Sequence, residues 1–276
     1  MKTASIQPVS IIKVTSHEMH EQEDLLAIEE PLEIQLVTST LHGRLRKNIS
    51  VTMRTPGDDA DLAAGFLFTE GIINNNREIE RINTKVGDDN VIIITLVENV
   101  SPSLLNSERN FYTTSSCGVC GKASIDAIKT ISVFSNLHTI FSLKAGLFYG
   151  LQDKLLAHQS VFESTGGLHA CALFDLNGKL VHIKEDVGRH NALDKLIGMA
   201  LLAGNLPLLN GILLLSGRAS FELIQKATMA GIKVIASIGA PSSLAVELAR
   251  ENDITLVSFL RKERFNIYAG AHRIML

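Results

Sequence analysis

Residues 211–260 read GILLLSGRASFELIQKATMAGIKVIASIGAPSSLAVELARENDITLVSFL. Apolar runs at 211–215, 233–238 and 254–260 alternate with two segments typical of helices, which predicts strand, helix, strand, helix and strand. Strands as apolar as these are buried on both faces, as in parallel sheets connected by right-handed helical crossovers. The pattern therefore predicts an α/β fold in this part of the chain.

The rest of the C-terminal part extends this domain. A strand–turn–strand unit at 170–183 precedes the apolar strands. Polar residues 101–116 are typical of a long exposed connection, and residues 122–133 predict a short amphipathic helix. We therefore predict a three-layer α/β domain with a mostly parallel sheet spanning residues 109–276.

The N-terminal part has a different pattern. Apolar and polar residues alternate between 32 and 53, which predicts two half-buried strands, and a buried strand follows at 91–97. With a helix that begins near Asp58, they indicate a small α+β domain over residues 32–108. Residues 1–31 form an N-terminal arm, predicted to be solvated or partly disordered because its second half carries six acidic residues.

Composition excludes several classes of protein. The 276 residues include 26 Lys and Arg against 29 Asp and Glu, a net charge of −3 that argues against a general binder of nucleic acid or acidic membranes. No apolar run approaches the ~20 residues of a membrane span, and the first residues lack a signal-peptide core, so we expect a cytoplasmic protein. Three cysteines, an odd and small count, exclude a disulfide framework.

The turns after the three predicted parallel strands are candidates for ligand binding. Ligands of open parallel sheets bind beyond the carboxyl ends of the strands. Ser216-Gly217-Arg218 and residues 239–243 are small-residue turns that begin helices, where free N–H groups favour anions. Residues 261–264 carry three cations. A phosphorylated or nucleotide-like ligand is one interpretation; ordinary helix caps and a solvated basic loop are the other. The sequence contains neither a Walker loop nor Gly-x-Gly-x-x-Gly, which excludes standard NTPases and dinucleotide reductases.

The pair Cys117 and Cys120 lies in the glycine-rich stretch SSCGVCGK. Such a pair can ligate metal, cycle as a redox couple or carry sulfur, and Lys122 favours the reactive thiolate. Structural zinc would need a second ligand pair at matching spacing, which is missing. A deaminase site needs Glu two residues after its His, but Cys171 stands two residues after His169. Sulfur relay fits a mobile thiolate loop better, while burial of the two cysteines as small apolar side chains is the alternative.

Several motifs together resemble one family, the formate dehydrogenase accessory sulfurtransferases (FdhD), over about residues 30–276. The motifs, in chain order, are DLAAGFL at 61–67 with EGI at 70–72, SCGVCGK at 116–122, TGGLHA at 165–170, EDVGRHNALDK at 185–195, SGRASFE at 216–222 and APSSLAV at 240–246. The resemblance implies a cytidine-deaminase-like fold and a homodimer.

The resemblance also implies a function. Family members take persulfide sulfur from a cysteine desulfurase and deliver it to bis-molybdopterin guanine dinucleotide, the cofactor of formate dehydrogenase. Cys117 corresponds to the persulfide carrier and Cys120 to a supporting thiol. With Arg218 from the strand-end turn, the residues expected to bind the cofactor are Phe259, Leu260, Arg261, Lys262, Glu263 and Arg264.

Two other functions remain open, a non-catalytic chaperone for the cofactor and a redox-sensing thiol pair. Individual residues also have alternatives. Cys171 is predicted to be a buried strand residue, or else an extra sulfur acceptor. His169 is a candidate for lining the pocket. Residues 188–191 either contact cofactor phosphate or are structural, with His190 a hydrogen-bonding residue and Asp194 and Lys195 on the surface of the following helix.

Overall fold

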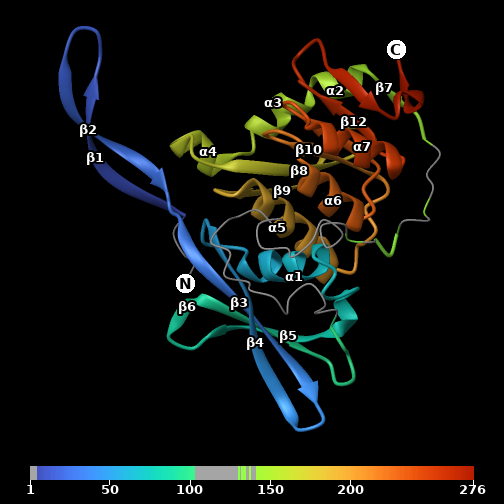
Figure 1. Cartoon of the computed structure of the whole chain (residues 1–276). Coiled ribbons are helices and arrows are strands. Elements are labelled where there is room, and N and C mark those ends of the chain that lie inside the picture. The colour runs from blue at the N-terminus through green and yellow to red at the C-terminus, as the bar shows by residue number, and fades with distance from the viewer. Residues whose placement is uncertain (1–4, 103–129, 131, 135–136, 138–140) are drawn as a thin grey trace.

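The computed structural model describes residues 5–102, 130, 132–134, 137 and 141–276 (Figure 1). Its main domain is built on a six-stranded sheet. In order across the sheet the strands are β13 (Asn266–Ala269), β12 (Thr255–Ser258), β11 (Val234–Ser237), β10 (Gly211–Leu215), β8 (His169–Asp175) and β9 (Leu180–Asp186).

The sheet is mixed, so the prediction of a mostly parallel sheet was wrong. Only β10, β11 and β12 run parallel; β8 and β9 at one edge and β13 at the other pair antiparallel. The short turn at Asn177-Gly178, with Gly178 at a φ of 76°, joins β8 to β9 as a hairpin. Residues 259–265 between β12 and β13 are likewise too few for a crossover, because parallel pairing needs a connection of about a dozen residues.

Helices cover both faces of this sheet, as predicted for three layers. On one face lie α5 (Arg189–Leu202), α6 (Phe221–Met229) and α7 (Ser243–Glu251); on the other lie α2 (Gly146–Tyr149) and α3 (Leu151–Leu156). Alternation along β8 explains the two cores. Cys171 and Leu173 pack with the first group of helices, whereas Ala172 and Phe174 pack with the second. The α/β fold class is therefore confirmed.

A second, four-stranded sheet lies on the far side of the first group of helices. Its order is β4 (Gly43–Arg54), β3 (Glu30–Thr40), β6 (Asp88–Leu96) and β5 (Ile79–Lys85). Helix α1 (Asp59–Thr69) packs between this sheet and α5, and the two helices cross at glycines. A Cβ at Gly65 would lie 1.9 Å from the carbonyl oxygen of Asp194, and one at Gly198 would lie 1.8 Å from that of Asp61. The two sheets therefore share one apolar core.

The N-terminal segment is an ordered hairpin of β1 (Ile6–Val14) and β2 (Met19–Ala27), not a partly disordered arm. The register runs from Ile6 opposite Ala27 to Val14 opposite Met19. Strand β1 is rich in Ile and Val, the β-branched residues typical of strands, a signal that the high content of acidic residues in the second half of the segment concealed. Figure 1 shows the hairpin extending away from the body of the molecule.

Short elements complete the described chain: the 3-10 helices η1 (Asn76–Glu78) and η3 (Ala271–Arg273), helix α4 (Ser160–Thr165), and the two-stranded pair of β7 (Leu143–Lys144) and β14 (Ile274–Met275). No helix in the described ranges is long and apolar enough to cross a membrane. Cys117 and Cys120 lie outside the described residues, as do nearly all of the connection predicted at 101–116 and the helix predicted at 122–133.

Candidate functional site

The carboxyl ends of the three parallel strands meet at one edge, as their order in the sequence predicted. Gly239, after β11, joins its two neighbours through the main chain. Its N–H donates to the carbonyl of Gly217 at 2.9 Å, and its own carbonyl accepts from the N–H of Phe259 at 3.2 Å. The turns after β10, β11 and β12 therefore lie side by side.

A pocket of about 340 Å³ opens at this edge and is lined by Arg189, Arg218, Ala219, Ser220, Ala240, Pro241 and Ser242. Helices α5, α6 and α7 all begin here. The Ser242 hydroxyl accepts from the N–H of Ala245 and caps α7, whereas the Ser220 hydroxyl makes no such cap. Helix N-termini carry partial positive charge and unpaired N–H groups, so three of them favour an anionic ligand.

Two arginines strengthen this preference for anions. Arg218 lines the pocket, as its position after β10 led us to expect. Arg189 is the first residue of α5, and its buried Nε has no hydrogen-bond partner among the described residues. A guanidinium binds phosphate through paired hydrogen bonds, and a buried unpaired donor is costly until such a partner arrives. From the sequence, Arg189 was a candidate for phosphate binding only as a member of segment 188–191, which could also be structural.

The basic residues after β12 are not gathered in this pocket. Arg261 donates from Nη1 to the carbonyls of Ile238 and Leu260, at 2.9 and 2.7 Å. Lys262 is exposed and lies 3.7 Å from Asp153 of α3, on the opposite helical layer. The pocket lining includes none of residues 259–264. The structure therefore separates these side chains from Arg189 and Arg218.

The other residues of this segment differ in their exposure. Leu260 is fully buried in the core against α2 and α3, so its side chain serves packing. Phe259 adopts a left-handed φ of 55° and is 39% exposed. Glu263 and Arg264 are exposed, and the carbonyl of Arg264 closes a tight turn by accepting from the N–H of Arg261 at 2.9 Å.

Two histidines lie beside the pocket. A Cβ on Gly217 would lie 3.4 Å from Nδ1 of His169, which places this imidazole against the turn after β10. Burial, followed by the charge of Arg189, lowers the pKa of His169, so its ring is neutral at pH 7. His190 Nε2 lies 3.5 Å from both the hydroxyl of Ser220 and a carboxylate oxygen of Glu222, contacts that favour its structural interpretation.

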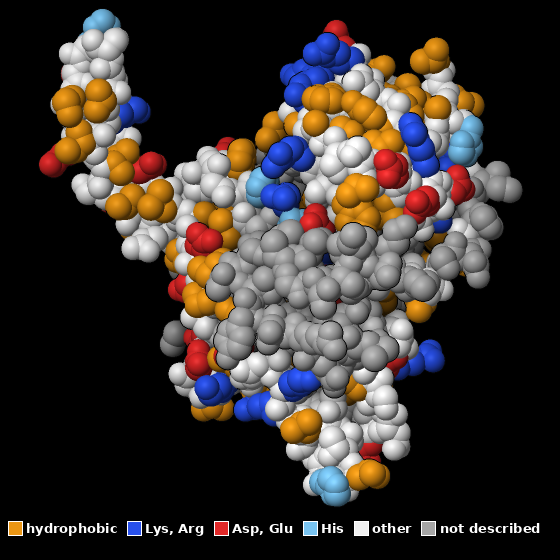
Figure 2. All heavy atoms as spheres, in the orientation of Figure 1, with side chains coloured by type: hydrophobic (Ala, Val, Ile, Leu, Met, Phe, Trp, Pro, Cys, Tyr) orange, Lys and Arg blue, Asp and Glu red, His pale blue; other side chains and the backbone are white. Residues whose placement is uncertain are grey.

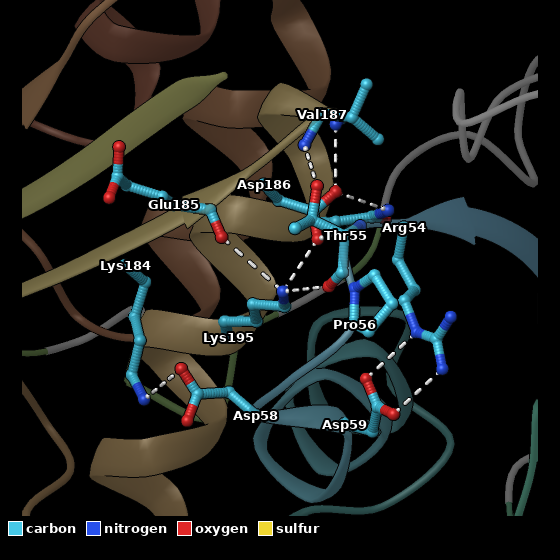
Figure 3. Close-up of polar contacts among 12 residues, drawn as sticks. Arg54, Thr55, Pro56, Asp58, Asp59, Lys184, Glu185, Asp186, Val187 and Lys195 are labelled. Carbon is cyan, nitrogen blue, oxygen red and sulfur yellow. Dashed lines mark hydrogen bonds and ion pairs between the residues drawn. The ribbon is translucent and has the colours of Figure 1, made fainter. Parts of the chain in front are cut away.

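A buried ion pair supports the turn that carries Arg189 (Figure 3). Lys195 Nζ lies 2.7 Å from Oδ2 of Asp186, and it also donates to the carbonyl of Thr55 at 2.9 Å. The N–H of Thr55 donates to the same carboxylate at 3.2 Å. Oδ1 of Asp186 accepts from the N–H of Gly188 at 2.8 Å. The end of β4 and the start of α5 are therefore locked together next to the pocket.

The prediction that Asp194 and Lys195 lie on the surface was wrong. Both are buried, at 1% and 2% exposure: Asp194 lies against α1, and Lys195 lies against the ends of β4 and β9. The Asp194 carboxylate lies 2.9 Å from Nζ of Lys226 in α6 and accepts from the hydroxyl of Thr69 in α1 at 2.8 Å. Burial raises the pKa of Asp194, and the charge of Lys226 offsets part of this effect.

Cys171 is buried on β8, as predicted. Burial raises the pKa of its thiol, and the negative charges of Asp194 and Asp186 add to the effect. The thiol is therefore protonated and unreactive near neutral pH. Among the described residues, no group of three or more His, Cys, Asp or Glu side chains could hold a metal ion.

The architecture and the sequence motifs agree with a known family. The family model named FdhD/NarQ matches residues 27–275. The chain belongs to the FdhD/NarQ family. A sulfur carrier protein FdhD from Streptomyces avermitilis is 50% identical over 274 residues, covering 96% of this chain and 94% of the relative. The sulfur carrier protein FdhD of Sulfolobus acidocaldarius is 41% identical over 271 residues, covering 98% of this chain and 99% of that relative.

A solved structure shows the same fold in another FdhD-like chain. The solved structure is described as a formate dehydrogenase accessory protein from Desulfotalea psychrophila. It superposes on this chain with a TM-score of 0.74 at 25% sequence identity, covering 99% of this chain and 100% of the other. The resemblance to the FdhD family inferred from the sequence motifs is thus confirmed. The narrower description of the fold as cytidine-deaminase-like stays a prediction.

Proposed function

We propose that this chain is a cytoplasmic sulfur carrier for formate dehydrogenase. It accepts persulfide sulfur from a cysteine desulfurase and delivers it to bis-molybdopterin guanine dinucleotide, which is its substrate. Three findings support the proposal: the family, the names of its curated members, and the Cys117-x-x-Cys120 pair in the sequence. The homodimer implied by the family resemblance belongs to the same proposal.

The observation that carries the proposal is the pocket at the ends of β10 and β11. Three helix N-termini, Arg218 and the unpaired Nε of Arg189 converge on a volume of about 340 Å³. This volume suits a nucleotide-sized part of the cofactor, because ligand pockets typically span ~300–1,000 Å³. The diphosphate of the guanine dinucleotide has the charge that these groups favour. The exposed ring of Phe259, on the neighbouring strand end, offers a surface for stacking the guanine.

The loading step assigned to Cys117 balances as thiol–persulfide exchange. The Cys117 thiolate attacks the outer sulfur of the persulfide on the desulfurase, the sulfur–sulfur bond of the donor breaks, and its electron pair leaves with the donor thiolate. Cys117 then carries the sulfur as a persulfide. Cys120 is the supporting thiol of the pair.

Binding of the cofactor is tested by calorimetric titration with guanosine diphosphate. Each arginine–phosphate interaction contributes ~1.5–3 kcal/mol, so Arg189→Ala and Arg218→Ala should each weaken binding by about 10- to 150-fold. Lys262→Ala is the matched control, because this exposed cation lies outside the pocket lining. Equal losses in all three variants, or no binding by the wild type, would show that the ligand lies elsewhere.

The rival is a chaperone that binds and delivers the cofactor without carrying sulfur. Formate dehydrogenase activity in cells whose only copy of the protein carries Cys117→Ala distinguishes the two functions. A sulfur carrier loses the activity, whereas a pure chaperone keeps it. Nucleotide binding by the purified Cys117→Ala protein should stay at the wild-type level, which shows that the variant is folded.

A further inference from the structure

The β1–β2 hairpin (residues 6–27) carries an apolar surface that the described residues of its own chain leave uncovered. Figure 1 shows it projecting from the body, and Figure 2 shows hydrophobic side chains exposed along it. Ile12, Val14 and Met19 are 62%, 65% and 68% exposed. Ile12 and Val14 lie on one face because they are two residues apart in a strand, and Met19 joins them opposite Val14.

The hairpin meets the described body near its base and along α4, which contacts β2. At the base the hydroxyl of Ser5 donates to the carbonyl of Pro56 at 3.2 Å, and Ala27 lies against Gly167. A two-stranded hairpin is only marginally stable in water unless another surface covers it. An apolar surface that is needed for stability fits a permanent partner better than a sulfur donor or acceptor that must bind and leave.

The β3–β4 hairpin of the same chain (residues 30–54) offers a complementary surface. Among the strands that the structure describes, β4 is an edge of its sheet, and its outer backbone groups are available to another strand. Leu45 and Val51 on this strand are 54% and 44% exposed. Its charged residues near the tip are basic: Arg44, Arg46 and Lys47. In contrast, the charged residues of the β1–β2 hairpin are acidic except Lys13: Glu18, Glu21, Glu23 and Asp24.

The directions of the two hairpins allow a symmetric pair. They project from neighbouring points, where Glu30 pairs with Arg54, and Figure 1 shows them extending in nearly opposite directions. A two-fold axis near this point would lay each β1–β2 hairpin along the β3–β4 hairpin of the other copy. Lengths agree, since nine-residue strands span ~30 Å and the twelve-residue β4 spans ~40 Å at ~3.3 Å per residue.

We infer that the β1–β2 hairpin docks on the β3–β4 hairpin of a second copy of this chain, and that two such contacts form the dimer. The inference rests on the homodimer in the proposed function and specifies its interface. Two strands of nine residues per copy, together with the β4 surface that they cover, supply the ~20–30 residues a side of a standard interface.

Sedimentation velocity of the full chain at micromolar concentration tests the apolar part of this contact. The wild type should sediment as a dimer. Ile12→Asp combined with Val14→Asp should raise the dimer dissociation constant by at least about 100-fold, because two charges would be buried without partners. Val86→Asp is the matched control, since Val86 is 99% exposed in the turn between β5 and β6; it should leave the mass unchanged.

A charge exchange tests the identity of the docking surface. Glu21→Lys with Asp24→Lys should weaken the dimer, and Arg46→Glu with Lys47→Glu should do the same. Combining all four substitutions in one chain should restore it, because opposite charges again face each other. A monomeric wild type, a dimer insensitive to the first two pairs, or no recovery in the combined variant would overturn the inference.

Two further measurements on the same samples distinguish a failure of this inference from a failure of the proposed function. Nucleotide affinity and sulfur loading of Cys117 are measured on wild type and on the Ile12→Asp/Val14→Asp variant. A monomeric variant that still binds nucleotide is folded and supports the hairpin as the interface. Loss of sulfur loading with an unchanged dimer would instead assign the hairpin to the sulfur donor and refute docking on a second copy.

Discussion

Replacing Lys195 with methionine tests the buried contact that holds the Arg189 turn in place. Methionine keeps the apolar stem and removes the ammonium that lies 2.7 Å from Oδ2 of Asp186. The carboxylate is fully buried, at 0% exposure, so it is left without its counter-charge. Loss of one partner of a buried ion pair costs ~3–5 kcal/mol. Donors from Thr55, Gly188 and Asn191 still reach Asp186. We therefore expect the free energy of unfolding to fall by about 3 kcal/mol, the lower end of this range.

The free energy of unfolding, measured by urea titration with circular dichroism, provides the assay. Lys262→Met is the control, because it removes another lysine–aspartate pair whose side chains are 79% and 57% exposed, and pairs exposed to solvent contribute little. The control should leave the unfolding midpoint unchanged. Guanosine diphosphate binding to folded Lys195→Met should also weaken, because the Arg189 turn loses its support.

A destabilisation by Lys195→Met below about 1 kcal/mol would refute the reasoning, since it would mean that the ion pair contributes no more than a single neutral hydrogen bond. Lys195→Met combined with Asp186→Leu should recover part of the lost stability, because no unpaired charge then remains buried. If stability recovers but nucleotide binding does not, the Asp186 carboxylate is needed to orient the turn that carries Arg189.

Three further predictions concern packing and protonation. Gly65→Ala should lower the unfolding free energy by at least ~1–3 kcal/mol, because its Cβ would lie 1.9 Å from the Asp194 carbonyl, whereas Gly150→Ala, with nothing within 4 Å of its Cβ, should not; thermal unfolding compares them. The pKa of His169 in the folded protein lies below its unfolded value of about 6.5. The unfolded chain therefore binds more protons, and stability falls as pH drops below about 6.5. Urea titration at pH 7 and pH 5 checks the sign, because stability should depend less on pH in His169→Gln than in the wild type. Cys171 should resist iodoacetamide in the native protein, and Cys171→Ala should keep full sulfur loading; alkylation of this buried thiol without unfolding would contradict its placement.

The sequence was sufficient to predict the structure where the local hydrophobic pattern also determines how the strands are connected. The apolar runs at 211–215, 233–238 and 254–260 predicted three adjacent parallel strands, and the structure contains them as β10, β11 and β12. Because consecutive crossovers bring strand ends to one edge, the position of Arg218 in the sequence was enough to place it at the edge where the pocket opens.

The sequence pattern could not predict contacts between segments that lie far apart along the chain. Lys195 and Asp194 are charged residues in a helix, and residues of this kind are usually exposed. The packing of α1 over α5 at Gly65 helps to bury Asp194, and the ends of β4 and β9 enclose Lys195. The close approach of α1 also explains why Gly65 and Gly198 are both glycine, which no periodicity indicates.

The separation of the basic cluster has a similar cause. Arg261 and Lys262 are neighbours in the chain, but adjacent residues of an extended or turning segment point in different directions. Arg261 bonds to the carbonyls at the strand ends, whereas Lys262 lies near Asp153 on the other layer. The segment is therefore basic in sequence without forming one basic site.

Transfer of labelled sulfur from a cysteine desulfurase to the purified chain tests the proposed function most directly. We predict that the wild type acquires label from labelled cysteine, that peptide mass spectrometry places it on Cys117, and that Cys171→Ala acquires as much. Cys117→Ala should acquire none above a control without desulfurase. Label on Cys117→Ala at the wild-type level would contradict the assignment of Cys117 as the sulfur carrier.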